Sequence, residues 1–383
     1  MRHAREPVLT DLIINGKKFH IDTSKLRELS FEVGPFRPPS EGASQSLLLR
    51  FMRNCSWNKC TFCSMYKDEK FTLRSVEEIK QDIDNAKAMV GEMKEISHSL
   101  GRGGVVDEYT VYVILGSDAS LERDASFTNV AMWLLSGGRT AFLQDSNSLI
   151  IRPDDLVEAL EHLRSTFPSL KRVTSYCRSD TIARKKLEDL KRIREAGLDR
   201  LHVGLETGDD ELLERLKKLA KRREGRTSDY HIIGGRKAKE AGFQLSEYFM
   251  PGLGGKERWE QHALNTARVV NAIDPDYVRS RPLGLGGKTE LDEEWRRGDF
   301  ELTSFHERLV ELQTMVEALD FTGRLVFDHM GNAWRNASGL PLFTLDHEGY
   351  KFPDEKTTVL ELIDEGLSLD ESFHGREIPM RRL

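Results

Sequence analysis

The sequence lacks both a large excess of one charge and any long apolar run. Its 57 Lys and Arg residues stand against 63 Asp and Glu residues, which leaves a formal net charge of −6. This balance gives no general reason to expect nucleic acid or an anionic membrane as a partner. No apolar run approaches the roughly 20 residues that span a bilayer. The first residues, MRHAREPVLTDLIING, place charges where a signal peptide needs its apolar stretch. We therefore expect a cytoplasmic protein with no membrane partner and no nucleic acid partner.

Cysteine is scarce, and its distribution is uneven. The chain has four cysteines, of which Cys55, Cys60 and Cys63 lie in the nine-residue stretch CSWNKCTFC. A reducing compartment argues against disulfides, and clustered thiols are then more often metal ligands. A [4Fe-4S] cluster normally takes four thiolates. Three cysteines would leave one iron without a protein ligand, and a small molecule with an amine and a carboxylate could chelate that iron. The alternative is a structural zinc site, which needs a fourth ligand such as Cys177.

Short apolar runs alternate with amphipathic segments through the middle of the chain. This alternation predicts an α/β fold in which crossover helices connect the strands of a parallel sheet. The segment 105–136 is ambiguous, because TVYVIL favours a strand and AMWLL favours a helix. The expected strands are 46–53, 140–143, 172–176, 200–204, 243–249 and 276–281, with a further one at 324–327. The expected helices are 75–98, 154–166, 184–196, 209–222, 229–241, 257–273 and 303–319.

Three stretches carry a resemblance to a known family. They are the cysteine loop with Phe62 before its last cysteine, GLETGDDELLERLKK at 204–218, and YFMPGLGG at 248–255. Together they resemble the radical S-adenosylmethionine (SAM) superfamily, in the branch with oxygen-independent coproporphyrinogen oxidase-like and elongator-like proteins. The resemblance implies a partial (β/α)6 TIM-type barrel over residues 46–285. Residues 1–45 would then be an N-terminal extension, and 286–383 a small C-terminal helical or α+β segment covering the substrate.

The same resemblance implies the cofactors and the chemistry. It implies a [4Fe-4S] cluster on Cys55, Cys60 and Cys63 that reductively cleaves SAM to a 5′-deoxyadenosyl radical, with electrons from a donor such as flavodoxin or ferredoxin. The radical would abstract hydrogen from, or add to, a small organic substrate. The loop departs from the usual C-x3-C-x2-C spacing by one added residue. This puts in doubt which C–S bond breaks, so an amino-carboxypropyl radical, with transfer of that group, stays an alternative.

The resemblance also suggests residues for the SAM pocket. Phe62 would pack on the adenine, and Glu206, at the end of a strand, would bind the ribose hydroxyls. Lys218 or Arg178 would bind the methionyl carboxylate. The segment Gln144, Asp145 and Ser146 occupies the place of a Gly-Gly-Glu segment that grips the SAM amino group, where a carboxylate can act by a charge-assisted hydrogen bond. Gly252 would allow the backbone to approach the cofactor closely.

Four residues are candidates for the substrate site. Tyr248 and Arg281 follow the ends of two predicted strands, where the loops of such a barrel build the active site, and a guanidinium suits a carboxylate or phosphate. His329 and Asn332 follow the apolar run at 324–327, although His329 can equally be a core histidine. Two non-enzymatic interpretations remain open at this point. One is a zinc-stabilised barrel scaffold, and the other is an RNA-binding scaffold that uses the basic stretch 217–226.

Overall fold

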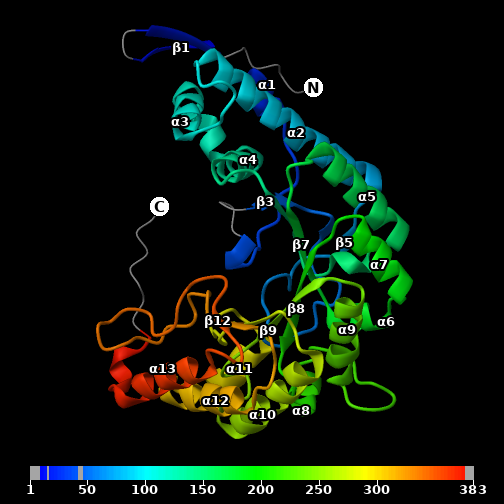
Figure 1. Cartoon of the computed structure of the whole chain (residues 1–383), viewed down its shortest axis with the longest axis vertical. Helices are drawn as coiled ribbons and strands as arrows, with labels where there is room; N and C mark the ends of the chain where they lie inside the picture. Colours follow the sequence, from blue (N-terminus) through cyan, green and yellow to red (C-terminus); the bar gives the residue numbers. More distant parts are fainter. Residues whose placement is uncertain (1–8, 15–16, 42–45, 376–383) are drawn as a thin grey trace. The chain divides into compact units, whose positions relative to one another are not determined.

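The computed structural model describes residues 9–14, 17–41 and 46–375 (Figure 1). The residues before Leu9, on which the expectation about a signal peptide rests, lie outside this part. Within the described residues, eight strands form one mostly parallel sheet in the order β12-β11-β10-β9-β8-β7-β6-β3. The strands of this sheet are β3 (Ser46–Leu49), β6 (Thr140–Leu143), β7 (Arg172–Cys177), β8 (Arg200–Glu206), β9 (Gln244–Phe249), β10 (Tyr277–Ser280), β11 (Arg324–Val326) and β12 (Tyr350–Lys351).

The six strands expected from the sequence are present and follow one another in chain order from β3 to β10. The first of them ends at Leu49 and not at residue 53, because Met52–Arg53 form the strand β4 of a separate sheet. Parallel pairing is recorded for β3 with β6, β6 with β7, β8 with β9, and β9 with β10. β11 adds a further parallel strand, and β12 pairs with it in the antiparallel sense. Parallel strands in chain order with helices between them are the arrangement of a TIM-type barrel, so the α/β class is confirmed. The domain boundaries at residues 45 and 285 stay a prediction.

The chain forms two compact units, which we describe separately. The first unit comprises Met1–Arg53, Phe71–Ser175 and Glu195–Asp199, and the second comprises Asn54–Lys70, Tyr176–Arg194 and Arg200–Leu383. Outside the main sheet, β1 (Leu9–Ile14) pairs with β2 (Lys17–Asp22), and β4 (Met52–Arg53) pairs with β5 (Thr72–Leu73). The short 3-10 helices are η1 (Pro39–Glu41), η2 (Ala119–Arg123), η3 (Ser148–Ile150) and η4 (Glu371–Phe373).

The first unit corrects one expectation. Its helices are α1 (Ser24–Glu28), α2 (Val76–Ser99), α3 (Glu108–Ser117), α4 (Ala125–Leu135) and α5 (Pro153–Thr166). The strand suggested by TVYVIL is wrong, because these residues lie in α3. Asp107 caps this helix by accepting a hydrogen bond from the Thr110 amide, and such a cap favours a helix over the β-propensity of the residues that follow. The N-terminal extension also contains regular structure, namely the β1–β2 hairpin and α1.

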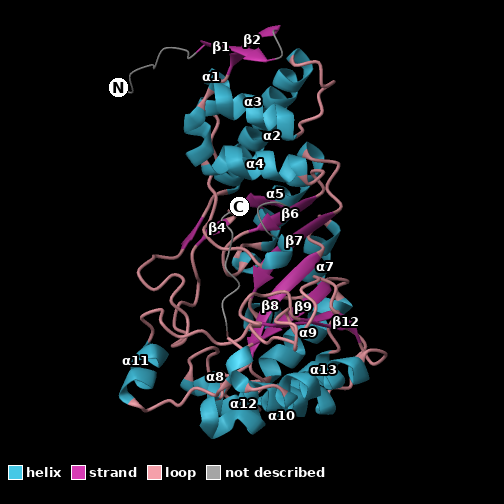
Figure 2. Cartoon of the chain, turned by 90° about the vertical axis from the view of Figure 1, so that its left-hand side faces the viewer, coloured by secondary structure: helices cyan, strands magenta, loops and turns pink. Residues whose placement is uncertain are grey.

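In the second unit, most expected helices are present, with changed ends. Its helices are α6 (Ser179–Arg184), α7 (Leu187–Glu195), α8 (Asp210–Arg215), α9 (Asp229–Glu240), α10 (Gly255–Ile273), α11 (Glu290–Arg297), α12 (Phe305–Ala318) and α13 (Lys356–Ser368). The helix expected at 184–196 is α7, which begins at Leu187 after the separate short helix α6, and the one expected at 209–222 ends at Arg215. Lys217 has a positive φ of 50°, which no α-helix accommodates, so the chain turns there. α10, α12 and α13 pack side by side in this unit (Figures 1 and 2).

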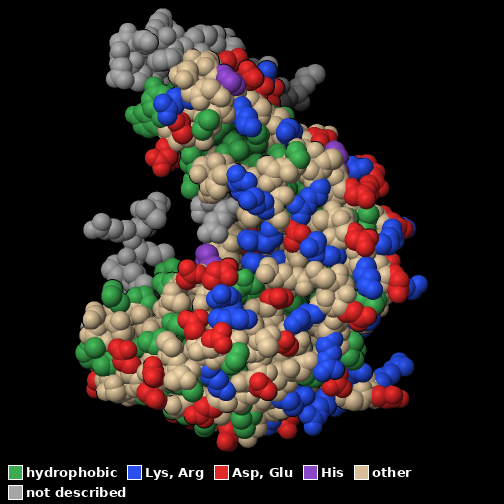
Figure 3. All heavy atoms as spheres, in the orientation of Figure 1, with side chains coloured by type: hydrophobic (Ala, Val, Ile, Leu, Met, Phe, Trp, Pro, Cys, Tyr) green, Lys and Arg blue, Asp and Glu red, His purple; other side chains and the backbone are tan. Residues whose placement is uncertain are grey.

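On the face shown in Figure 3, acidic and basic side chains are interspersed. Among the residues that the structure describes, no helix combines the length and hydrophobicity required to traverse a lipid bilayer.

Candidate active site

The cysteine loop belongs to the second unit, where the segment that follows α8 holds it in place. The Thr61 amide donates a hydrogen bond of 3.0 Å to the Leu216 carbonyl, and the Leu291 amide donates one of 3.0 Å to the Thr61 carbonyl. The Trp57 indole donates a hydrogen bond of 2.6 Å to the Lys217 carbonyl. Because α8 ends at Arg215, the carbonyl groups of the residues that follow are available to bind the cysteine loop.

The three thiols of this loop suit an iron–sulfur cluster. All are free, with Cys60 buried and Cys55 and Cys63 half-buried. Burial raises the pKa of Cys60, and the charges of Lys218 and Arg178 act in the opposite direction. Burial likewise raises the pKa of Cys63. Thiolates are the usual ligands of such clusters, and nearby cations favour the thiolate form. Cys55, Cys60 and Cys63 would hold the cluster.

The described residues contain no group of three or more His, Cys, Asp or Glu side chains arranged to share one metal ion. A [4Fe-4S] cube differs from a single ion in this respect, because each of its thiolates binds a different iron. Its ligands therefore lie farther apart than those of a zinc ion.

Next to the cysteine loop lies a buried ion pair between two residues that the sequence assigned to SAM. Lys218 Nζ is 2.9 Å from Glu206 Oε1, and the two side chains are only 12% and 13% exposed. Burial alone would lower the pKa of Lys218, but the charges of Glu206 and Cys60 raise it above its usual value. A Cβ at Gly204 would lie 2.3 Å from Glu206 Oε1 and 2.7 Å from Lys218 Nζ. With any other residue at this position, the ends of the Glu206 and Lys218 side chains would have to shift.

Glu206 itself has an unusual backbone conformation. Its φ is 62°, in the left-handed region that residues other than glycine, Asn and Asp seldom adopt. The strand pairing between β8 and β9 is irregular between Gly204 and Glu206. Strained backbone of this kind concentrates at functional sites, where it directs a side chain. Here it accompanies the turn of the Glu206 carboxylate toward Lys218.

Arg178, the second candidate for the SAM carboxylate, joins the same group of residues. Its guanidinium lies 4.8 Å from the centre of the Trp57 ring. It donates a 3.0 Å hydrogen bond to the Lys218 carbonyl and one of 3.1 Å to Asp180. The structure therefore brings Arg178, Glu206 and Lys218 together beside the cysteine loop. For Arg178 these contacts indicate a positioning role, and its contact with SAM stays a prediction.

Phe62 lies against an apolar cluster of the second unit. This cluster is formed by Leu212, Leu216, Leu253, Leu283, Leu291 and Phe300, and the partly buried Phe62 and Met250 pack against it. The aromatic ring before the last cysteine thus contacts the wall to which the glycine-rich segment 250–255 contributes. This position is compatible with the predicted stacking on adenine, which stays a prediction.

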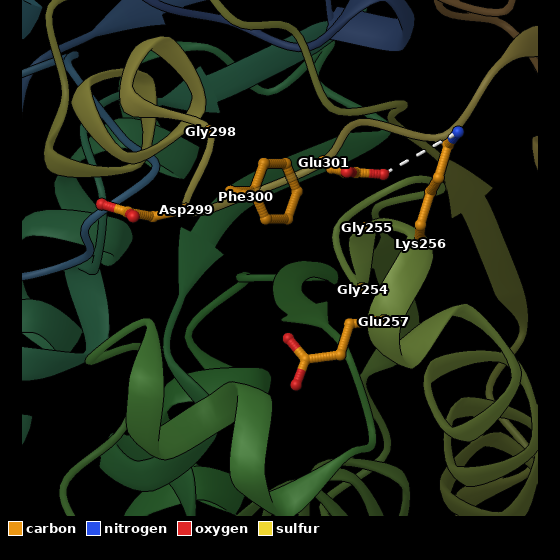
Figure 4. Close-up of a pocket in the computed structure, with 8 residues that line it drawn as sticks. All are labelled: Gly254, Gly255, Lys256, Glu257, Gly298, Asp299, Phe300 and Glu301. Carbon is orange, nitrogen blue, oxygen red and sulfur yellow. Dashed lines mark ion pairs between the residues drawn. The ribbon is translucent and has the colours of Figure 1, made fainter.

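The glycines of segment 250–255 are needed for contacts within the protein. A Cβ at Gly252, whose φ is 85°, would lie 2.8 Å from Arg308 Nε, and a Cβ at Gly255 would lie 2.6 Å from the Phe300 ring. Figure 4 shows the pocket next to this turn, where Gly254 and Gly255 face Phe300 and Glu301. The close neighbours of Gly252 are therefore side chains of the protein, and its predicted role in binding the cofactor remains untested.

A buried polar network fixes the other side of the same segment. Glu311 accepts a hydrogen bond from the Gly252 amide at 3.0 Å, and His262 lies 3.1 Å from the Met250 carbonyl and 2.7 Å from the Thr207 hydroxyl. Burial raises the pKa of Glu311 to about 8 and lowers the pKa of His262 to about 4. Both side chains are therefore mainly uncharged at pH 7. They connect α10 and α12 to the loop that follows β9.

The raised pKa of Glu311 predicts a dependence of stability on pH. Between the ordinary value of 4.5 and about 8, the unfolded chain releases this proton and the folded chain keeps it, so stability falls as the pH rises through this range. From pH 5.5 to 8.5, we expect the free energy of unfolding of Glu311→Gln to fall less than that of the wild type, by on the order of a few kcal/mol. Denaturant titrations at the two pH values measure this. The exposed Glu301→Gln is the control, and a wild-type slope in Glu311→Gln would contradict the account.

The segment Gln144–Ser146 belongs to the first unit, and its side chains have partners there. Gln144 accepts a hydrogen bond from the Gly34 amide at 2.7 Å and donates one to the Gly34 carbonyl at 2.8 Å. Asp145, with a φ of 67°, forms an ion pair with Arg50 at 2.6 Å. The Gln144 side chain thus holds the N-terminal extension, and Arg50 balances the charge of Asp145. A role of Gln144, Asp145 or Ser146 in binding SAM stays a prediction.

Of the four substrate candidates, two lie together. The Arg281 guanidinium is 4.5 Å from the centre of the Tyr248 ring. Asn332 instead bonds to Ser280 at 2.7 Å, and His329 accepts a hydrogen bond from the Gly331 amide at 3.0 Å. These contacts favour local structural roles for Asn332 and His329. For His329 this agrees with the alternative from the sequence, in which it is a core histidine.

The sequence did not single out Arg279, Asp328 and His347. Asp328 contacts Arg281, and the other two residues contact Asp328. Asp328 forms ion pairs with Arg279 at 2.6 Å and with Arg281 at 2.8 Å, and His347 lies 2.9 Å from the same carboxylate. Arg279 could have been predicted from the sequence. It lies two residues before Arg281 at the end of a strand, and residues at this spacing share one face of a sheet. The partners at 328 and 347 are too distant in sequence to be assigned by any local pattern.

Comparisons with known proteins bear on the family. A family model described as the radical SAM superfamily matches residues 49–267. Among curated proteins, none matches the sequence significantly. Solved structures similar to the chain include archaeal Elp3 from Methanocaldococcus infernus, with 15% identity, 59% of this chain and 53% of that chain covered, and a TM-score of 0.39. The structure of methylornithine synthase is 16% identical, and the match covers 82% of this chain and 80% of that chain, with a TM-score of 0.41.

Coproporphyrinogen III oxidase from Escherichia coli, described as a radical SAM enzyme, shares 14% identity, with 73% of this chain and 53% of that chain covered and a TM-score of 0.41. The chain thus spans about half the length of the Elp3 and coproporphyrinogen oxidase structures. The family model carries the assignment, because it covers more than half of the chain and includes the cysteine loop. This protein belongs to the radical SAM superfamily and is an enzyme with a [4Fe-4S] cluster and S-adenosylmethionine as cofactors.

Proposed function

We propose that the enzyme cleaves SAM to a 5′-deoxyadenosyl radical, which abstracts hydrogen from a small organic substrate. The observation that carries the proposal is the position of the Glu206–Lys218 ion pair next to Cys60. It places a carboxylate from the end of β8 and an ammonium group from the segment that follows α8 beside Cys60. When bound, the cluster supplies the electron that breaks the sulfonium bond of SAM, and methionine leaves with that electron.

The residues of the chain have distinct roles in this proposal. Cys55, Cys60 and Cys63 hold the cluster, and Glu206 binds the ribose hydroxyls of SAM. Lys218 neutralises the methionyl carboxylate, since a partly buried ammonium group interacts strongly with a carboxylate. Phe62 packs on the adenine, and Arg178 positions the cysteine loop through Trp57. The segment 286–383 contributes Asp328, which forms an ion pair with Arg281, and this supports its predicted role as a cover for the substrate.

The identity of the nucleoside product tests this proposal. The enzyme is reconstituted with iron and sulfide without oxygen, reduced with dithionite and incubated with SAM, and the products are separated by liquid chromatography and mass spectrometry. We expect 5′-deoxyadenosine in amounts that exceed those of a control without reductant at least about tenfold. Methylthioadenosine as the main product would instead identify the amino-carboxypropyl radical and contradict the proposal. Colourless protein with stoichiometric zinc would support the scaffold alternative.

The physiological electron donor is proposed to be a flavodoxin or a ferredoxin. We also propose a cytoplasmic location, which fits the oxygen-sensitive chemistry of the cluster. The substrate is proposed to be a small molecule.

A further inference from the structure

A cluster of charged side chains lies at the end of β10, apart from the cysteine loop. Arg279 and Arg281 each donate a hydrogen bond to the Asp328 carboxylate, at 2.6 Å and 2.8 Å. The side chains of Arg279 and Asp328 are fully buried, whereas that of Arg281 is 14% exposed. A further hydrogen bond, of 3.1 Å, runs from Arg279 to the Ser246 hydroxyl on β9. Arg279 is thus part of the interior, and Arg281 is the arginine that reaches the edge of the cluster.

The charges of this cluster do not balance. Among the residues that the structure describes, Asp328 is the one carboxylate that forms an ion pair with either arginine. His347 lies against Asp328 and adds no negative charge. Burial, assisted by the charge of Arg281, lowers the pKa of His329 to about 4, so His329 is neutral at pH 7. One positive charge therefore remains without a counter-charge, and an uncompensated charge away from water is costly.

Donors in the cluster are also unused. The Nη2 atoms of Arg279 and Arg281 are buried and have no hydrogen-bond partner among the described residues. Buried donors without a partner are uncommon in native proteins and call for an explanation. A planar guanidinium matches a carboxylate with two parallel hydrogen bonds. Since Arg279 is the closer partner of Asp328, Arg281 is the residue whose charge and donors are available to a ligand after a small rotation of its side chain.

The surroundings of Arg281 connect it to the proposed SAM site. Its guanidinium lies over Tyr248, whose ring centre is 5.3 Å from that of His202 and 6.2 Å from that of Tyr176. Tyr248 is paired in register with Gly204, the residue over which Glu206 and Lys218 meet. An aromatic wall thus extends from the excess positive charge to the ion pair assigned to SAM.

We propose that the substrate carries a carboxylate, which Arg281 binds while Arg279 and Asp328 hold Arg281 in position and Tyr248 lines the adjoining wall. This inference deepens the proposed function and rests on it. Two other anions have related chemistry, namely the methionyl carboxylate of SAM itself and a phosphate group. The experiment must therefore separate these sources from a carboxylate on the substrate.

The test uses the reconstituted enzyme with saturating SAM, and benzoate as the probe. Benzoate combines a carboxylate with a ring that suits the aromatic wall, and benzamide is its neutral counterpart of the same shape. We expect benzoate to raise the midpoint of thermal unfolding in a concentration-dependent manner, because it binds the folded protein. Benzamide should have no such effect. Inorganic phosphate is the third probe, and a larger shift with phosphate than with benzoate would overturn the choice of a carboxylate.

Three variants assign the effect to Arg281. Arg281→Gln should weaken benzoate binding about tenfold or more, because it removes the charge and the fork of donors. Arg281→Lys keeps the charge and should recover part of the affinity. Arg324→Gln is the matched control, because this arginine lies on the next strand and pairs with the exposed Glu348; it should bind benzoate like the wild type.

The methionyl carboxylate of SAM is the remaining anion that Arg281 could bind. Equilibrium dialysis with SAM on the same variants distinguishes this carboxylate from one on the substrate. If Arg281→Gln weakens SAM binding as strongly as benzoate binding, the arginine serves the cofactor and the inference is overturned. A wild-type response to benzoate in Arg281→Gln would also overturn it. Failure of the proposed function would look different, because the wild type would then bind benzoate and form no 5′-deoxyadenosine.

Discussion

Cys60→Ala is expected to lose the cluster and with it the cleavage of SAM. Removal of outer partners of metal ligands typically costs about 10–100-fold in metal affinity or activity, so the loss of a direct ligand should reduce the yield of 5′-deoxyadenosine at least about a hundredfold. Cys60 is the buried thiol of the loop, and the nearby charges of Lys218 and Arg178 favour its thiolate form. Iron and sulfide analysis of the reconstituted variant, together with the product assay, measures both effects.

The control for this variant is Cys177→Ala. Cys177 is the other buried cysteine and lies on β7, where burial raises the pKa of its thiol well above the usual value. It should retain about four irons and four sulfides per chain. Loss of bound metal in Cys177→Ala would instead identify a fourth ligand and favour the zinc alternative. Circular dichroism of both variants excludes unfolding as the cause, and normal turnover by Cys60→Ala would contradict the cluster assignment.

Lys218→Met is expected to have the second large effect, on stability and on the affinity for SAM. Loss of one partner of a buried ion pair typically costs about 3–5 kcal/mol, because the other charge is left unpaired. A lost hydrogen bond to a charged group costs about 1.5–3 kcal/mol, so the affinity for SAM should fall about tenfold to a hundredfold. Denaturant titrations and equilibrium dialysis with SAM measure the two quantities.

The neighbouring Lys217 offers a matched control for this prediction. It forms an ion pair with Glu290 at 2.7 Å, but the two side chains are 54% and 53% exposed. An exposed pair contributes about 0–1 kcal/mol, so Lys217→Met should stay close to the wild type in both measurements. The double variant Glu206→Gln/Lys218→Met should be more stable than Lys218→Met alone, because it leaves no unpaired charge. Equal effects of Lys217→Met and Lys218→Met would contradict the role of the buried pair.

Much of the fold was predictable because its signals are local. The strands from β3 to β10 are short apolar runs bounded by turn residues, and the stripe of α2, including Ile79, Ile83 and Ala86, repeats with the period of a helix and is buried. The cysteine loop was equally visible, since its three ligands lie within nine residues. The elements that the sequence predicted well are those whose evidence lies within a single turn or strand.

The remaining features depend on partners that are distant in sequence. The early end of α8 depends on Lys217 and Lys218, which turn to meet Trp57 and Glu206, and helical periodicity does not report such contacts. Gln144 was assigned to SAM by its position after β6, but its side chain binds the backbone at Gly34, 110 residues away. Asp328 meets Arg279 from 49 residues away. Local pattern cannot identify such pairs.

Because only three cysteines of the loop would hold the cluster, one of its irons is expected to be open to SAM. The most direct measurement is electron–nuclear double resonance on the reduced, reconstituted enzyme with SAM labelled with nitrogen-15 at its amino group. Direct coordination predicts a hyperfine coupling between that nitrogen and the cluster, which unlabelled SAM would show only for nitrogen-14. A reduced cluster with no coupling to the amino nitrogen of bound SAM would contradict the account.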